Sequence, residues 1–219
     1  MAVDKLVDST QLDSDLTSVA NAIRSKGGTS AQMAFPTGFV SAVQAIPTGG
    51  DSIIRQIVSL GENSLRGASI GEIGFFESLK TAGMHCLAYL PQTEILVFPA
   101  LTATQNYPFT DNVLLQKLDI GETLPSGSFS TYFFAGNRVL TEIILRMPVI
   151  RSLPSLNCFQ ETPFASDGSG GTLYVPGSLI SSYQTASNWA TILGYAHNSI
   201  VAIEGSPYEN YYADGTPIS

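Results

Sequence analysis

Charged residues are scarce in this chain of 219 residues, since Lys, Arg, Asp and Glu together make up only 13% of it. The 18 acidic residues outnumber the 10 basic ones, and Lys and Arg form no cluster. A net charge of -8 would repel a phosphate backbone, which argues against nucleic acid as a partner. So few charges also indicate a surface that is partly covered by a partner or by further copies, and we expect a homo-oligomer, with a trimer favoured.

Long apolar runs are missing as well, so the sequence predicts no membrane insertion. The first residues, MAVDKLVDSTQLD, contain neither the basic nor the apolar region of a secretory signal. We therefore expect a protein that stays in the cell where it is made, or that leaves it in a particle released by lysis.

Cysteine and histidine are rare, with two residues of each. Cys86 and Cys158 are too few for a disulfide scaffold, lack the spacing of metal ligands, and lie among apolar residues that predict buried thiols. His85 and His197 have no second ligand three or four residues away. The sequence thus predicts no metal site and no cofactor.

Catalytic motifs are missing too: there is no GxSxG nucleophile, no phosphate-binding P-loop and no GxGxxG that follows a strand. The glycine-rich SDGSGG at 166–171 precedes a predicted strand and not a helix, which is typical of a loop. The acidic residues that could pair in glycoside cleavage are scattered along the chain, and they are Asp111, Asp119, Glu122, Glu142, Glu161 and Asp167. We predict that the protein is not an enzyme, with glycan cleavage as the less favoured alternative.

Two amphipathic helices are predicted within residues 1–48. The first follows Thr10, and the second begins at Pro36 and ends at Pro47. Their apolar faces consist of Leu12, Leu16, Val19 and Ile23 in the first helix and of Phe35, Phe39, Val43 and Ile46 in the second. Because two short helices cannot build much of a core, we expect them to pack on each other and on the next domain, a neighbouring subunit or a larger assembly. In the last two cases they would form an oligomer or anchor the chain.

Short apolar strands at intervals are typical of the following part of the chain, residues 49–205. They are predicted at 93–99, 116–122, 141–148 and 171–176. With Ile95, Leu118, Ile143 and Leu173 taken as equivalent, the strands recur at intervals within the range of leucine-rich arrays of stacked repeats. An earlier unit is expected within residues 69–90.

Residues 170–193, GGTLYVPGSLISSYQTASNWATIL, predict a strand, a proline stop and a helix near 177–193 that carries the only tryptophan. The last unit of a stacked array leaves an apolar end open, so an atypical unit must close it. The residues predicted to form this structural cap are Tyr174, Pro176, Tyr183 and Trp189. A lone tryptophan at helical spacing with Leu and Tyr favours a place in the core.

The last residues, 206–219, hold Tyr208, Tyr211 and Tyr212 among Pro, Gly and acidic residues. Tyrosine offers a rigid contact area with a polar tip, which suits the binding of glycans or proteins. These three side chains are candidates for ligand binding, whereas packing of the segment on the last unit or on a neighbouring subunit is the favoured interpretation.

Two of these segments carry resemblances to known families. The strands LTEIILRMP and QTEILVFP, and above all the ending GGTLYVPGSLISSYQTASNWATI followed by SIVAIEG, resemble the leucine-rich repeats named for the bacterial surface antigen BspA. Residues 6–46 are similar to a short helical module that opens many phage and prophage structural proteins of Gram-positive bacteria. Together the resemblances imply a virion component with a helical anchor and an outward repeat domain, and they transfer no catalytic residue.

The expected fold class is α+β: a short N-terminal helical module, an irregular BspA-like leucine-rich-repeat solenoid of short strands, and a C-terminal capping helix. The expected domains are 1–48, 49–205 and 206–219. The expected function is that of a non-enzymatic phage structural protein, made in the bacterial cytoplasm and placed in a tail fibre, a baseplate or a capsid decoration. There it would bind other virion proteins and adhere to a host-surface glycan or protein. A bacterial cell-surface adhesin is the alternative.

Overall fold

The computed structural model describes residue 17 and residues 49–218. The chain divides into two units, Met1–Ser52 and Ile53–Ser219, and the described residues belong almost entirely to the second. The two helices predicted in residues 1–48, with their apolar faces from Leu12 to Ile46, lie outside the described residues.

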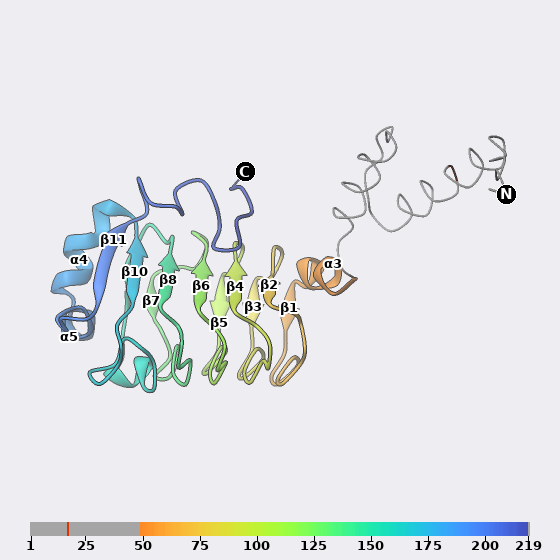
Figure 1. Cartoon of the computed structure of the whole chain (residues 1–219), viewed down its shortest axis with the longest axis horizontal. Coiled ribbons are helices and arrows are strands. Elements are labelled where there is room, and N and C mark those ends of the chain that lie inside the picture. The colour runs from red at the N-terminus through yellow and green to blue at the C-terminus, as the bar shows by residue number, and fades with distance from the viewer. Residues whose placement is uncertain (1–16, 18–48, 219) are drawn as a thin grey trace, which may run out of the picture. The chain divides into compact units, whose positions relative to one another are not determined.

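A six-stranded parallel sheet is the largest sheet of the second unit (Figure 1). Its strands are β2 (Ile73–Phe75), β4 (Ile95–Phe98), β6 (Lys117–Ile120), β8 (Glu142–Leu145), β10 (Thr172–Val175) and β11 (Ser199–Ala202). Their spatial order is β11–β10–β8–β6–β4–β2, so each later strand is added beside the one before it. Strand β11 continues the sheet beyond β10, which is therefore not its edge strand.

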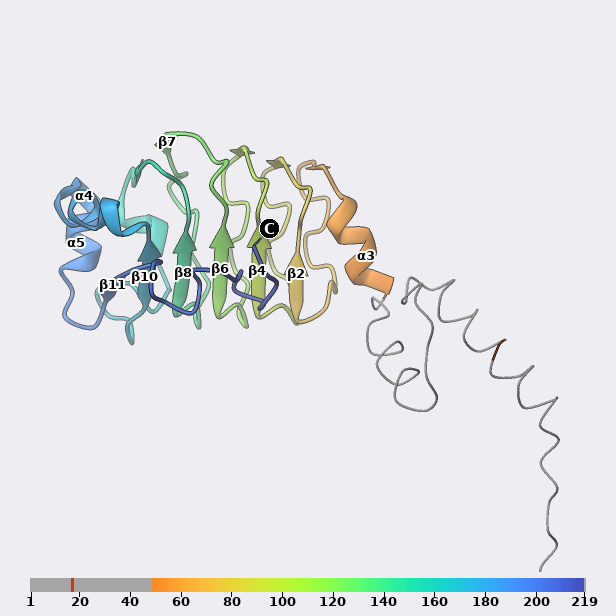
Figure 2. The same ribbon diagram turned by 90° about the horizontal axis from the view of Figure 1, so that it is seen from above.

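Shorter strands form two smaller parallel sheets on the other side of the turns (Figure 2). One consists of β1 (Ser59–Leu60), β3 (Thr81–Ala82) and β5 (Ala103–Thr104), and the other of β7 (Gly127–Ser128) and β9 (Arg151–Ser152). Since β3, β5, β7 and β9 each lie between two strands of the large sheet along the chain, successive turns of the chain visit both sides.

Helices are few and short in the described residues. They are α3 (Gly49–Gln56), the 3-10 helices η1 (Leu156–Phe159) and η2 (Gly177–Leu179), α4 (Ile180–Thr185) and α5 (Ser187–Leu193). The continuous helix predicted near 177–193 is wrong, because Ala186 between α4 and α5 has an extended backbone with φ -75° and ψ 118°. No helix of the described residues is long and apolar enough to cross a membrane.

The expected fold class is wrong. In place of an α+β fold with a helical module and an irregular solenoid of short strands, the described residues form mostly parallel sheets with few helices, an α/β-type arrangement. Apolar spacing along a chain identifies strands, but it does not say how they pair. Every pair among the named strands is parallel, and the register is continuous from β2 to β11.

The predicted alignment of the strands is also shifted by one position at its start. Leu96, and not Ile95, lies in register with Leu118, Ile143 and Leu173, so the first interval is shorter than predicted. A shift of one position exchanges the two faces of a strand. Leu96 accordingly lies in the main core, whereas Ile95 packs on the opposite face of the sheet.

The two faces of the six-stranded sheet cover two separate apolar cores. Leu96 and Phe98 of β4 belong to the main core inside the turns, and Val97 between them belongs to the smaller core on the outer face. Ile143 and Ile144 of β8 are divided in the same way. This alternation is the period of two that any strand imposes on its side chains.

Buried amide side chains tie neighbouring turns together inside the main core. Asn112 and Asn137 are both fully buried. The Asn112 side chain accepts a hydrogen bond from the Leu90 amide at 2.7 Å and donates to the carbonyl oxygens of Leu87 and Phe109. The side chain of Asn137 accepts one from the Asn112 amide at 2.9 Å and donates to Phe134 at 2.7 Å. We call Asn112 and Asn137 the asparagine ladder.

Removing one rung of the asparagine ladder should destabilise the protein strongly. In Asn137→Ala, the Asn112 amide and the Phe134 carbonyl lose their partners in a buried place, and we expect a loss of about 2–4 kcal/mol in the free energy of unfolding. Urea unfolding followed by circular dichroism measures this loss. Asn106, which is exposed, provides the control, and an equal loss in Asn106→Ala and Asn137→Ala would contradict the role of the ladder.

The buried thiol of Cys86 should make the protein less stable in alkaline solution. The predicted burial of both cysteines is confirmed, and burial raises the pKa of the Cys86 thiol to about 12. Because the unfolded chain releases this proton near pH 9, stability falls as the pH rises from about 9 to 12, by up to about 1.4 kcal/mol per pH unit. Denaturant unfolding between about pH 8 and 10.5 should therefore give a steeper decline for the wild type than for Cys86→Ala. Equal slopes would contradict the prediction.

Candidate functional site

A pocket of about 220 Å³ lies on the segments that lead from the smaller sheets back to the six-stranded sheet. Four successive segments line it: the one between β3 and β4, the one between β5 and β6, the one between β7 and β8, and the one between β9 and β10. The sheets and the asparagine ladder hold these four segments side by side, so a fixed scaffold positions the pocket.

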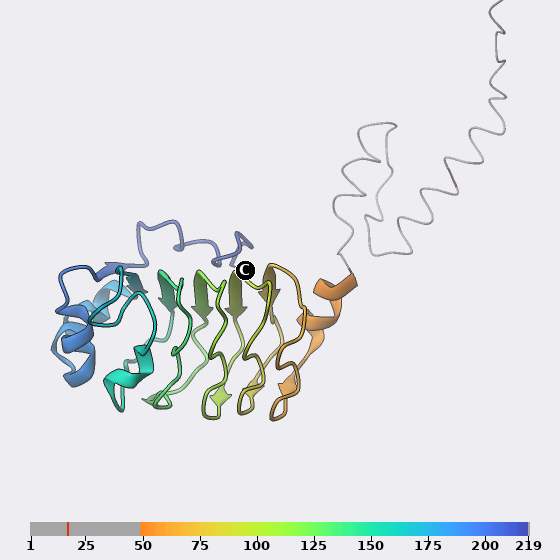
Figure 3. The same ribbon diagram turned by 60° about the horizontal axis from the view of Figure 1, so that its bottom comes forward.

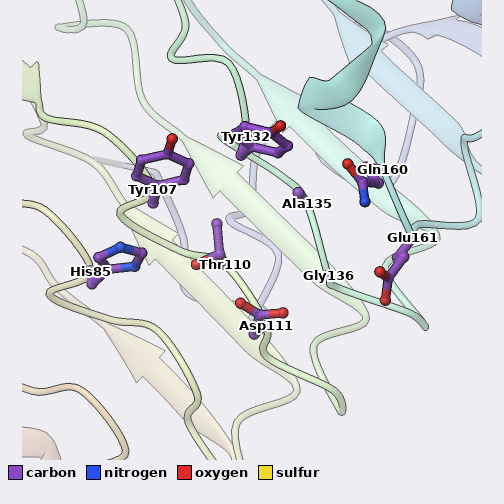
Figure 4. A pocket seen from close by; sticks show the side chains of 9 residues that line it. All are labelled: His85, Tyr107, Thr110, Asp111, Tyr132, Ala135, Gly136, Gln160 and Glu161. Carbon is purple, nitrogen blue, oxygen red and sulfur yellow. The ribbon is translucent and has the colours of Figure 1, made fainter.

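One wall of the pocket is a row of three stacked rings, those of His85, Tyr107 and Tyr132 (Figure 4). The centroids of His85 and Tyr107 are 5.0 Å apart with planes inclined by 7°, and those of Tyr107 and Tyr132 are 5.4 Å apart with planes inclined by 23°. Because the rings stack on one another, each ring covers a face of its neighbour. We call these three residues the ring wall.

Thr110 lies between the ring wall and the acidic side of the pocket (Figure 4). Its side chain is 3% exposed, and its Oγ1 is buried without a hydrogen-bond partner among the described residues. Nδ1 of His85 is buried and unpartnered in the same sense. Since buried polar atoms in proteins are nearly always hydrogen-bonded, two such atoms among the residues that line one pocket make it a candidate ligand site.

The opposite side of the pocket carries two carboxylates, Asp111 and Glu161. Glu161 forms an ion pair with Arg138, with 2.7 Å between Oε2 and NH2. The Asp111 carboxylate forms no hydrogen bond or ion pair within the described residues. Of the six acidic residues considered for glycoside cleavage, these two line this pocket.

Both carboxylates extend from a backbone position that favours glycine. The amides of Gly67, Tyr89, Asp111 and Gly136 each donate to a carbonyl on the next turn, at 2.9, 3.2, 3.1 and 2.9 Å, and Glu161 follows in the series. All five residues have positive φ, from 55° at Glu161 to 75° at Gly136. Side chains at such positions cost conformational energy, which proteins retain mostly at functional sites. The carboxylates of Asp111 and Glu161 are therefore candidates for function.

A second hollow, of about 290 Å³, adjoins the pocket and shares Glu161 with it. Its other lining residues include Arg138, Asp167 and Ser169. The glycine-rich segment 166–171, predicted to be a loop, lies here and contributes no strand until Thr172. His197 lies in a third hollow, where its Nε2 contacts the Ala165 carbonyl at 3.0 Å, so the two histidines line different hollows.

The remaining acidic candidates lie away from the pocket. Asp119 is buried in a two-point ion pair with Arg146, with both contacts at 2.8 Å. Burial raises the pKa of the Asp119 carboxyl, and the Arg146 contacts oppose that rise. Glu142 lies 3.3 Å from Lys117, and Glu122 is exposed. Among the described residues, no group of three or more His, Cys, Asp or Glu could hold a metal ion.

The tyrosines named as candidates for ligand binding lie in the C-terminal segment that crosses the outer face of the six-stranded sheet (Figure 3). Tyr208 is buried, its hydroxyl donates to Glu142, and it accepts from Lys117 at 3.0 Å. Tyr212 packs edge to face on Phe75 with 5.6 Å between ring centroids, whereas Tyr211 is 50% exposed. Within the chain, Tyr208 and Tyr212 thus pack on the sheet.

Arg146 fixes this segment to the sheet. Its guanidinium donates to the carbonyls of Tyr208 at 2.8 Å and Tyr211 at 2.9 Å while it pairs with Asp119. Asp119 in turn accepts a hydrogen bond from the Ala213 amide at 2.9 Å. Charged hydrogen bonds in a buried place are among the strong ones, so the segment is held at several points.

The residues predicted to form a cap lie around the last helices and β10. Trp189 is 1% exposed, and its indole N–H donates to the Arg151 carbonyl at 2.7 Å. Tyr183 is also buried and packs edge to face on Trp189 at 5.0 Å. Tyr174 of β10 contacts Tyr208 on the outer face, and Pro176 follows β10 directly.

Sequence reasoning missed the ring wall and Thr110. The aromatic segments of the sequence indicate packing alone. Nothing in a sequence says which ring of a pair such as Tyr132 and Phe133 turns outward. One signal was present: the two intervals that separate His85, Tyr107 and Tyr132 are the same as those between the paired strand residues of β4, β6 and β8.

Adding a methyl group at Gly136 should disturb the pocket. A Cβ there would lie 2.3 Å from Oδ1 of Asp111, and the φ of +75° disfavours a side chain. We expect Gly136→Ala to lose about 2–4 kcal/mol in the free energy of unfolding.

Gly67 provides the matched control, because it holds the equivalent position with φ +70° and has no atom within 4 Å of a built Cβ. Gly67→Ala should lose only about 1 kcal/mol. In an Asp111→Gly background, where only the backbone contact with residue 111 remains, Gly136→Ala should lose less than it does in the wild type, and chemical denaturation of the four variants measures this coupling. Equal losses in Gly67→Ala and Gly136→Ala would contradict the contact.

Comparison with known proteins leaves the pocket to be interpreted from its own geometry. No family model matches the chain, and neither curated proteins nor solved structures give a match. What the geometry offers is a small, polar, ring-lined pocket on a rigid scaffold, whose arrangement suits the recognition of a ligand.

Proposed function

We propose that the chain is a non-enzymatic structural protein of a phage particle that adheres to the host surface through the pocket beside the ring wall. In this proposal residues 1–48 attach the chain to other virion proteins or form a homo-oligomer. The unit from Ile53 onward then presents the pocket to the host. A tail fibre, a baseplate and a capsid decoration are the places where such a protein would act.

The observation that carries the proposal is the pocket itself, with the buried and unpartnered hydroxyl of Thr110. A binding site has to keep its hydrogen-bonding groups free until the ligand arrives, and it gains affinity when they are already fixed in place. The four segments that form the pocket are backed by a continuous parallel sheet, and the asparagine ladder ties three of them together. This combination suits a preformed adhesion surface.

A shallow site of this size supports adhesion only if many copies act together. The pocket of about 220 Å³ is smaller than the roughly 300–1,000 Å³ that is usual for small-molecule sites. A weak site repeated on a symmetric particle gains avidity, because the second and later contacts form at a high effective concentration. The expected oligomer and the expected place on a particle both meet this need.

Glycan cleavage is the second candidate, because Asp111 and Glu161 line the same pocket and glycosidases use two carboxylates. One of these two carboxylates, Glu161, is however already engaged in an ion pair with Arg138, with 2.7 Å between Oε2 and NH2. The arrangement therefore favours binding over cleavage. Release of reducing ends from a host glycan, lost in Asp111→Asn, would establish the enzyme instead.

The place of the protein can be tested by immuno-electron microscopy with an antibody against residues 53–205, applied to particles induced from the source culture. Since the protein is proposed to be a virion component, we expect label on the particles, at the tail tip for receptor binding or over the capsid for decoration. Particles from a strain that lacks residues 1–48 of the protein should lose the label, because these residues are the proposed anchor.

Label on bacterial envelopes with bare particles would overturn the virion proposal and favour the bacterial surface adhesin. Label on particles that lack residues 1–48 would leave the virion in place but contradict the role of these residues. Adhesion is tested separately, since particles that carry Thr110→Val should adsorb to host cells more weakly than wild-type particles. Equal adsorption would contradict adhesion through the pocket.

A further inference from the structure

We propose that the pocket and the adjoining hollow bind a linear, neutral, hydroxyl-rich polysaccharide, with one sugar ring in the pocket and the next ring beyond Glu161. This inference rests on the proposed adhesion function and names its ligand class and its second subsite. It is carried by the unpartnered polar atoms of the pocket, by the charges around it, by its size and by its continuation.

The free polar atoms of the pocket need a partner that both donates and accepts hydrogen bonds. The Asp111 carboxylate accepts only, whereas the Thr110 hydroxyl does both, and Nδ1 of His85 is also without a partner among the described residues. Hydroxyl groups on adjacent ring carbons meet all three needs, because each can donate to one protein atom and accept from another. Gln160 also lines the pocket, and its side-chain amide likewise both donates and accepts hydrogen bonds.

The charges around the pocket argue against an anionic ligand. Two carboxylates and, among the described residues, no Lys or Arg line the pocket. Arg138 lines the second hollow and is paired with Glu161 at 2.7 Å. A net charge of -8 would further repel an acidic polymer.

The pocket also suits a cationic ligand less well than a neutral one. Ring faces attract cations, but in the ring wall His85 and Tyr107 cover each other's faces, as do Tyr107 and Tyr132. A covered face is not open to a cation, and the edge of an aromatic ring is its positive part. The ring wall therefore suits the hydroxyl and C–H groups of a neutral sugar.

The size and the continuation of the pocket indicate a chain of sugar rings. The pocket, of about 220 Å³, is below the usual range for a small-molecule site and suits a single ring. Glu161 also lines the second hollow of about 290 Å³, where Asp167 and Ser169 provide further carboxylate and hydroxyl groups. A second ring of the same polymer would meet the same kind of polar groups there.

The test uses the full chain and isothermal titration calorimetry with neutral hexose oligomers of one to six units from the maltose, cellobiose and mannan series. Polygalacturonate and chitosan oligomers provide the acidic and the amine-bearing arms. We expect at least one neutral series to bind with a Kd of about 1 mM or tighter, and roughly tenfold more tightly once two rings are linked.

Two variants locate the subsites. Thr110→Val keeps the shape and removes a hydroxyl that has no partner within the described residues, so it should unfold at the wild-type denaturant concentration and bind roughly tenfold more weakly. Ser169→Trp should fill the second hollow, so it should bind a single unit like the wild type and gain nothing from the second. Thr93→Val is the reverse control: the buried Thr93 side chain loses its hydrogen bond to the Gly71 carbonyl, so this variant should be less stable and should bind normally.

Two outcomes overturn the inference. Either no neutral series binds, or the acidic or amine-bearing oligomers bind more tightly than the neutral ones. If single units bind as well as longer ones, the second subsite is wrong, while a loss of binding in Thr110→Val still supports the pocket. If host adsorption is unchanged by Thr110→Val as well, the adhesion proposal itself is wrong.

Discussion

The hydrogen bonds of the asparagine ladder are the constraint on which the rest of the described unit depends. Asn112 and Asn137 pair with backbone groups that no regular secondary structure satisfies, and they do so in a place closed to water. The residue directly before each of them, Asp111 or Gly136, lies at the edge of the pocket. The bonds that hold neighbouring turns together inside the core therefore also fix the spacing of the groups outside it.

Strand positions could be predicted from the sequence, but pairing and exposure could not. The apolar runs around Leu118, Ile143 and Leu173 predicted three strands that the structure contains. Ile95 and Leu96 are both apolar, so only the pairing with β6 decides which of them enters the main core. The break between α4 and α5 at Ala186 could not be predicted either, because an extended backbone at an alanine does not change the apolar pattern of the sequence.

The candidate site was harder to predict than the strands, for a physical reason. His85 comes from one turn of the chain and Tyr107 and Thr110 from the next, and only the stacking of these turns makes them neighbours. Asp111 and Glu161 are recognisable as acidic residues, but their shared pocket depends on Gly136 between them, which leaves room for the Asp111 carboxylate. A glycine in a loop predicts a turn, and it does not tell which side chain the open space admits.

The C-terminal segment determines what kind of surface the outer face of the sheet presents. Phe75, Val97 and Ile144 form an apolar strip there, which the segment from Ile203 to Ala213 covers. A protease that cut after β11 would remove that cover and leave the charge of Arg146 without the carbonyl groups it binds. The trimmed chain would keep its sheet and its pocket but would expose a flat, apolar face. One short segment thus determines whether this apolar face is covered or exposed.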